Sequence, residues 1–221
     1  MLFRSVKGYS ASDAGLKLIP LMLGIVTTSI FSGKMISKHG HYKRFPIVGT
    51  FLMTIGILAM TRLEIDTPYW QISIYAVIVG MGLGLSMQTI VIALQNSVEL
   101  SDMGVATSSN TFFRSLGSVF GTAFFGAILT NRLAHYLAAS GLKGGGETSI
   151  TNNTALIKKL PPEVQSTILE SFVKSFHFVF YTAAPVTALG FALALMLKEV
   201  PLRTHGDYSK AREEAAGETL G

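Results

Sequence analysis

The chain has 221 residues, of which 49% are hydrophobic and only 14% are charged, and its mean hydropathy is +0.45. Soluble domains carry about 25% charged residues, so this composition disfavours a soluble fold. The sequence contains no cysteine, which excludes disulfides, thiolate metal sites and a catalytic thiol. The net charge of +5 does not indicate nucleic-acid binding, because the basic residues lie in loops between apolar segments, where they suit anionic lipid headgroups.

Five apolar segments predict membrane-spanning helices, since a span takes about 20 residues. In chain order they cover residues 14–35, 46–60, 70–94, 108–133 and 176–197. None has the charged face of a helix on a soluble protein, and a chain of this length could not cover five such helices in a soluble core. The sequence therefore predicts an all-α membrane protein.

The connections between the segments differ in length and charge. The first is a short basic hairpin with Lys and Arg at four positions, whereas the second is nearly neutral and the third is polar. The fourth is an outer loop over 134–175, with a Gly-rich part that should be flexible and a "PPEVQSTILESF" part that predicts a short interfacial helix. Residues 198–221 are polar and predict a disordered tail.

The distribution of basic residues predicts the orientation. Short loops rich in Lys and Arg face the cytoplasm, and the first connection is the most basic of the short loops. We therefore expect the hairpin, the third connection and the C-terminus to be cytoplasmic.

The hairpin "GKMISKHGHYKR" resembles the motif G-x-L-x-D-R-x-G-R-R/K-x of the major facilitator superfamily. Ser37 stands where the motif has Asp, so the acidic partner of that family's cytoplasmic gate is missing here. The stretches "GMGLGLSMQTIVIALQNSV", "GVATSSNTFFRSLGSVFGTAFFGAIL" and "KEVPLR" are similar to the C-terminal half of the drug:proton antiporters of the EmrB/QacA type.

This resemblance implies that residues 1–197 form most of the C-terminal six-helix half of a major facilitator fold. The chain would then be a C-terminal fragment whose partners are the lipid bilayer, the missing N-terminal half, amphipathic or cationic small molecules, and protons. The implied function is proton-coupled multidrug efflux across a bacterial plasma (inner) membrane, with no enzymatic activity, cofactor, metal or nucleic-acid partner. The alternatives are a metabolite or siderophore exporter of the same fold, and a small membrane interaction or regulatory subunit without transport activity.

Several polar and aromatic residues within the spans are candidates for a substrate path. Gln88 is the most polar residue inside 70–94, so we expect it to face the bundle interior, as a substrate contact or an interhelical hydrogen bond. Thr27, Thr28 and Thr122 are weaker candidates, because a Thr hydroxyl can bond its own helix backbone. Phe120 belongs to a group of phenylalanines that could wall an apolar path.

Arg114 is expected about six residues into its span, about 9 Å deep. It could snorkel to the interface, or it could form a cytoplasmic gate with Glu99 or Asp102. The hairpin supplies the other gate candidates, Gly33, Ser37, Lys38, Gly40, His41, Lys43 and Arg44.

Two further patterns bear on mechanism. The spacings Gly80-x3-Gly84 and Gly117-x3-Gly121 allow close helix contact, for packing within this bundle or for a hinge or cavity. No Asp or Glu lies within any predicted span. A proton-coupled exporter needs an intramembrane carboxylate, so we expect that group to lie outside this chain.

Overall fold

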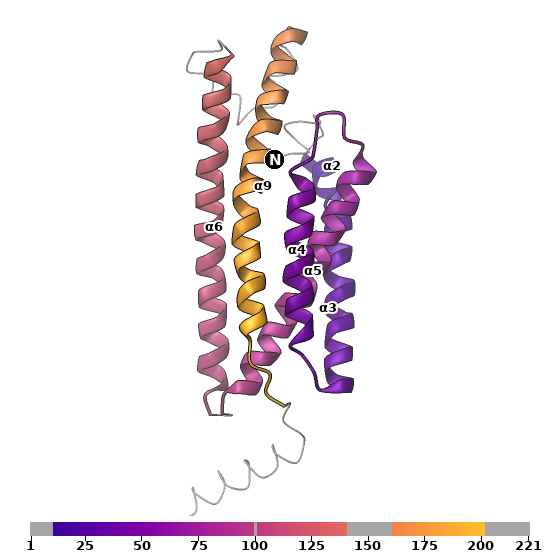
Figure 1. The fold of residues 1–221 in the computed structure, drawn as a ribbon, viewed down its shortest axis with the longest axis vertical. Coiled ribbons are helices and arrows are strands. Elements are labelled where there is room, and N and C mark those ends of the chain that lie inside the picture. Colours follow the sequence, from indigo (N-terminus) through magenta and orange to yellow (C-terminus); the bar gives the residue numbers. More distant parts are fainter. Residues whose placement is uncertain (1–10, 100, 141–160, 202–221) are drawn as a thin grey trace, which may run out of the picture.

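The computed structural model describes residues 11–99, 101–140 and 161–201, and this part of the chain is helical with short connections (Figure 1). The helices are α2 (Ala11–Leu16), α3 (Ile19–His39), α4 (Arg44–Met60), α5 (Tyr69–Ser97), α6 (Met103–Ala139) and α9 (Pro162–Met196). Among the described residues, four of these helices, namely α3, α5, α6 and α9, are long and apolar enough to cross a membrane. The 17-residue α4 is apolar but shorter. The prediction of an all-α membrane protein is thereby confirmed.

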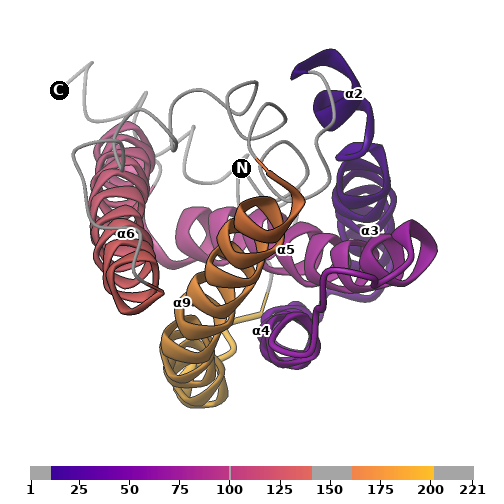
Figure 2. The same ribbon diagram turned by 90° about the horizontal axis from the view of Figure 1, so that it is seen from above.

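Helix α5 organises the bundle. It packs along α3 on one side and α4 on the other, while α9 lies between α4 and α6. Seen from above, α5 runs obliquely, from α3 at one end toward α6 at the other (Figure 2). Helix α6 is therefore held mainly by α9 and contacts α5 only slightly.

Glycines permit the close crossings of α5. A Cβ on Gly82 would lie 2.5 Å from Cγ of Met53 and 2.8 Å from the backbone nitrogen of Met53, in α4. On the other face of α5, a Cβ on Gly84 would collide with the carbonyl oxygen of Ile25 in α3. Such backbone contact replaces side-chain burial as the source of packing energy between membrane helices.

The first predicted helix, over 14–35, is interrupted near its start. The structure has the separate α2, a turn at Lys17 and Leu18, and then α3, with Pro20 in its first turn. Proline has no N–H to bond the preceding turn, so it opens a helix rather than continuing one. At its other end α3 continues to His39, until Gly40 takes a left-handed conformation with φ of 73°.

The segment 134–175, predicted as an outer loop, is helical at both of its ends. Residues 134–139 belong to α6, and residues 162–175 belong to α9 rather than to a separate interfacial helix. Leu133 and Leu137 of α6 pack against Ile168 and Phe172 of α9, and all four are buried. This apolar cluster stabilises the two helices beyond the expected spans; residues 141–160 lie outside the described part of the chain.

Candidate functional site

The hairpin between α3 and α4 is an ordered structure. The backbone N–H of Gly40 donates to the Ile36 carbonyl at 2.8 Å and closes α3. Nδ1 of His41 donates to the His39 carbonyl at 2.8 Å, which satisfies an acceptor that the helix end leaves open. Tyr42 is only 1% exposed and packs with Ile36 beneath the turn. The turn is thus built on a buried aromatic residue, with its basic side chains outside.

The predicted gate residues of the hairpin divide by position. Gly33, Ser37 and Lys38 lie on α3, and the last two are exposed. Lys43 is partly buried before α4, whereas Arg44 opens that helix and is exposed.

A clasp joins the hairpin, the end of α5 and the segment after α9; it consists of Tyr42, Asn96, Val200 and Pro201. The backbone N–H of Val200 donates to the Tyr42 hydroxyl at 2.9 Å. Nδ2 of Asn96 donates to the carbonyls of Val200 at 3.1 Å and Pro201 at 2.9 Å. The three segments consequently lie at one end of the bundle, and the first residues of the predicted disordered tail, 198–201, are held in place.

Sequence reasoning missed this clasp. Tyr42 and Asn96 both lie within the motif stretches quoted above, but neither was predicted to form a contact. The available signal was an amide at the end of an apolar helix, where a polar group needs a partner. That signal does not say which of the many backbone carbonyls the amide bonds.

The candidates on α3 and α5 fall on different faces. Thr27 is exposed and donates to the Leu23 carbonyl at 2.6 Å, so its hydroxyl is satisfied within its own helix. Thr28 is buried and donates to the Gly24 carbonyl at 2.7 Å and, across the helix pair, to the Met81 carbonyl at 3.0 Å. The Thr28 hydroxyl therefore joins α3 to α5, which is a role in helix packing rather than in lining a cavity.

Gln88 departs from the expectation that it faces the bundle interior. It is exposed among the described helices, and the interior position beside it is Thr89, which is 0% exposed. On α6, Phe120 is 67% exposed. Thr122 is also exposed and donates to the Ser118 carbonyl at 2.8 Å. The structure does not bring these three side chains together with Thr28.

Arg114 lies deeper in its helix than expected, because α6 begins at Met103 rather than near residue 108. Eleven residues separate Arg114 from the helix start, a rise of about 16 Å. Arg114 is exposed, and within the described residues no ion pair joins it to Glu99 or Asp102. Both acids are exposed: Asp102 lies in the turn that leads into α6, and Glu99 lies before that turn. The two glycine pairs also differ. A Cβ on Gly80 or Gly84 would collide with the backbone of α3, whereas a Cβ on Gly117 or Gly121 would have no neighbour within 4 Å among the described residues.

Helix α6 presents two further stripes. Small and hydroxylic side chains recur at spacings of three and four along one face, at Ser108, Thr111, Ser115, Ser118, Thr122 and Gly126. Large apolar side chains cover another face, at Val105, Phe112, Phe113, Val119, Phe120 and Phe124, all between 58% and 69% exposed. None of the 18-residue span window of α6 is buried within the described structure. Within the described residues, no cluster of His, Asp or Glu could hold a metal ion.

The helices, their exposed apolar faces and the basic hairpin define a multi-pass membrane protein. The family comparison agrees, because the model of the Major Facilitator Superfamily matches residues 8–219. The chain belongs to the Major Facilitator Superfamily.

Curated relatives share much of the chain. An uncharacterized MFS-type transporter of Mycobacterium tuberculosis is 39% identical over 197 residues, which cover 89% of this chain and 29% of the relative. The multidrug transporter protein MdtP of Bacillus subtilis is 31% identical over 98% of this chain and 45% of the relative. A tetracycline resistance determinant of Streptomyces rimosus is 27% identical over 98% of this chain and 70% of the relative. The chain thus spans less than half the length of the first two, and both of these relatives carry the name of a transporter.

Proposed function

We propose that the chain is the C-terminal part of a proton-coupled multidrug exporter and forms most of one helical half of the transport unit. The observation that carries this proposal is α6, a membrane-length helix with no buried residue in its span window. A stripe of small and hydroxylic residues is typical of contact between membrane helices. We infer that this stripe packs on the remainder of the transporter, which the longer relatives contain.

The proposed substrates are amphipathic or cationic drugs, because two relatives carry the names of a multidrug transporter and a tetracycline resistance determinant. The exposed phenylalanines of α6 supply an apolar wall, and Gln88 on α5 supplies a hydrogen-bonding group. Proton coupling requires a carboxylate in the membrane, and the sequence has none within its predicted spans. The proposal places that carboxylate in the remainder of the transporter.

Arg114 fits the same proposal as a gate residue. A cation about 16 Å along an apolar helix is costly against lipid, so it should meet a partner in the assembled transporter. In the part of the chain that the structure describes, no ion pair joins Arg114 to Glu99 or Asp102, so we propose a carboxylate or carbonyl of the remaining helices as its partner in one conformation.

A chimera tests the function. The corresponding C-terminal region of MdtP is replaced by residues 1–221, and efflux of ethidium is measured in a drug-sensitive host. We expect the chimera to export the dye, residues 1–221 alone to export none, and a protonophore to abolish export. Energy-dependent efflux by residues 1–221 alone would refute the division between two parts. A chimera that reaches the membrane at the parent level but exports nothing would refute the assignment to drug efflux.

A further inference from the structure

The groove between α3 and α4, at the end of the bundle where the hairpin lies, has an apolar interior. Its volume is about 480 Å³, and Phe31, Met35, Phe45, Val48 and Leu85 line it. Leu85 of α5 forms the floor, because α3 and α4 both pack on α5 but hardly touch one another. Phe31 and Val48 are 55% and 48% exposed, so the groove opens on the outside of the bundle.

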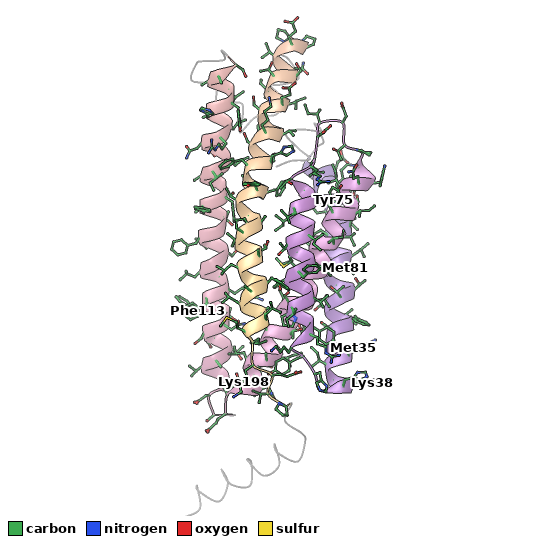
Figure 3. The ribbon with its side chains drawn as sticks, viewed as in Figure 1. Met35, Lys38, Tyr75, Met81, Phe113 and Lys198 are labelled. Atoms are coloured by element: carbon green, nitrogen blue, oxygen red, sulfur yellow. The ribbon has the colours of Figure 1, made fainter. Side chains whose placement is uncertain are left out.

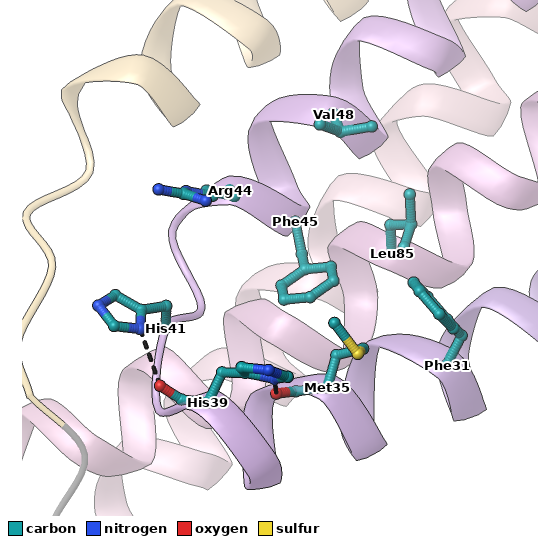
Figure 4. Close-up of a pocket in the computed structure, with 8 residues that line it drawn as sticks. All are labelled: Phe31, Met35, His39, His41, Arg44, Phe45, Val48 and Leu85. Atoms are coloured by element: carbon teal, nitrogen blue, oxygen red, sulfur yellow. Dashed lines mark hydrogen bonds between the residues drawn. The ribbon is translucent and has the colours of Figure 1, made fainter.

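The rim of the same groove is basic. His39, His41 and Arg44 complete its lining, and Figure 4 shows the three polar side chains at the edge, with Phe45 directed toward Met35 and Phe31 inside. Arginine is always charged in proteins, and the N-terminus of α4, where Arg44 sits, adds the positive end of a helix dipole. A cavity with an apolar interior and a cationic rim is complementary to a molecule with an acyl chain and a phosphate.

The rim is held in a fixed position. Nδ1 of His41 donates to the His39 carbonyl at 2.8 Å, and Nδ1 of His39 donates to the Met35 carbonyl at 3.3 Å (Figure 4). Both rings thus donate through Nδ1 to the backbone, and in a neutral ring Nε2 is then an acceptor, so the N–H groups that a phosphate can accept from are those of Arg44. The buried Tyr42 and its bond to Val200 fix the turn from below.

We propose that this groove is a binding site for one anionic phospholipid, with an acyl chain along Phe31, Phe45 and Val48 and the phosphate at Arg44. The membrane supplies the ligand, because the groove opens between two apolar helices at the level where α3 ends and α4 begins. The site is independent of the transported substrate. It gives the hairpin a second role, as the receptor for a lipid headgroup.

Site-specific lipid crosslinking tests this proposal on the chain at its full natural length. The photoreactive residue p-benzoylphenylalanine replaces Val48, in the groove, or Leu193, which is 59% exposed on α9. Val48 is four residues from the start of α4 and Leu193 is three residues from the end of α9. Figure 3 shows Met35 of the groove and Lys198, just after α9, at the same end of the bundle, so the two probes sample similar depths. Each protein is reconstituted in nanodiscs of phosphatidylethanolamine and phosphatidylglycerol, and mass spectrometry counts the adducts of each lipid.

A cationic contact near the membrane surface is worth about 1 kcal/mol, or about a five-fold preference for an anionic lipid. We expect phosphatidylglycerol to be enriched about five-fold among adducts at Val48 and not enriched at Leu193. The variant Arg44→Gln should remove the enrichment at Val48 while leaving the total lipid adduct there unchanged. Equal enrichment at both probes, an enrichment that survives Arg44→Gln, or adducts at Val48 with protein instead of lipid would each overturn the proposal.

Discussion

A single glycine-to-alanine change should have opposite effects in α5 and α6. In Gly82→Ala the new methyl group would meet Met53 at 2.5 Å and 2.8 Å, so α4 and α5 must separate. Overpacking of this kind costs about 1–3 kcal/mol, against a helix-propensity gain of about 0.5–1 kcal/mol. In Gly117→Ala nothing lies within 4 Å of the new methyl group, so only the gain remains. The two variants should therefore differ in stability by about 1–3 kcal/mol, the packing term alone.

Thermal unfolding in detergent measures this difference. For a chain of this size 1 kcal/mol corresponds to about 2–4 °C in Tm. A fusion of residues 1–221 to a fluorescent protein, followed by size-exclusion chromatography after heating, should show a lower midpoint for Gly82→Ala and an unchanged or raised midpoint for Gly117→Ala. The reasoning fails if both variants shift the midpoint equally. In the MdtP chimera, Gly117→Ala should slow export if α6 packs there on the remaining helices.

Three further predictions concern the hairpin end of the bundle and α6. Ser37→Cys, in a chain without other cysteine, should resist membrane-impermeant thiol reagents in intact cells and react after permeabilisation; rapid labelling in intact cells would reverse the predicted orientation. Asn96→Ala should release the segment after α9, because the loss of one amide removes the donor of two hydrogen bonds, to the carbonyls of Val200 and Pro201. If this loss weakens the attachment of the segment by about 1–2 kcal/mol, trypsin cleavage after Lys198 should accelerate about 5- to 30-fold. Tyr42→Phe removes one hydrogen bond and should accelerate the cleavage less. In the chimera, Arg114→Ala should slow dye export and Arg114→Lys should restore part of it; export at the parent rate by both, at matched abundance, would leave Arg114 no gating role.

The sequence was sufficient to predict an all-α membrane protein, and each of the five predicted segments overlaps a helix of the structure, because length and hydropathy largely determine apolar helices. It was less informative at their ends. The stretch "PPEVQSTILESF", with Pro near its start, predicted an interfacial helix separate from the span. In the structure Glu170 and Lys174 form an exposed ion pair at 3.4 Å on the outside of a continuous helix, and the buried face is apolar. Charges four residues apart are compatible with a long helix, so composition alone misplaced the boundary.

Side-chain partners were harder to predict than helix positions. The glycines of α5 and α6 have the same spacing, but those of α5 meet α3 and α4 while those of α6 meet open space. Likewise Thr27 and Thr28 are adjacent and chemically identical, and only Thr28 reaches the next helix. Adjacent residues of an α-helix point about 100° apart, so only one of two neighbours faces the next helix. A pattern of small residues in the sequence does not reveal which helix, if any, will lie against it.

The faces of α6 show how the hairpin groove and the proposed transport function are separate properties of one fold. Helix α9 covers one face of α6, through contacts such as Arg132 over the ring of Phe178 at 3.7 Å. The remaining two faces differ in chemistry, one small and hydroxylic and one aromatic, and a helix surrounded only by lipid would have no need for that difference. The hydroxyls of Ser108 and Thr122 bond their own helix, so the small face is neutral and close-fitting rather than reactive. We therefore expect the small face of α6 to contact other helices and the aromatic face to line an apolar path or to meet lipid. The proposed lipid groove lies between α3 and α4, away from α6, and depends on neither face of α6.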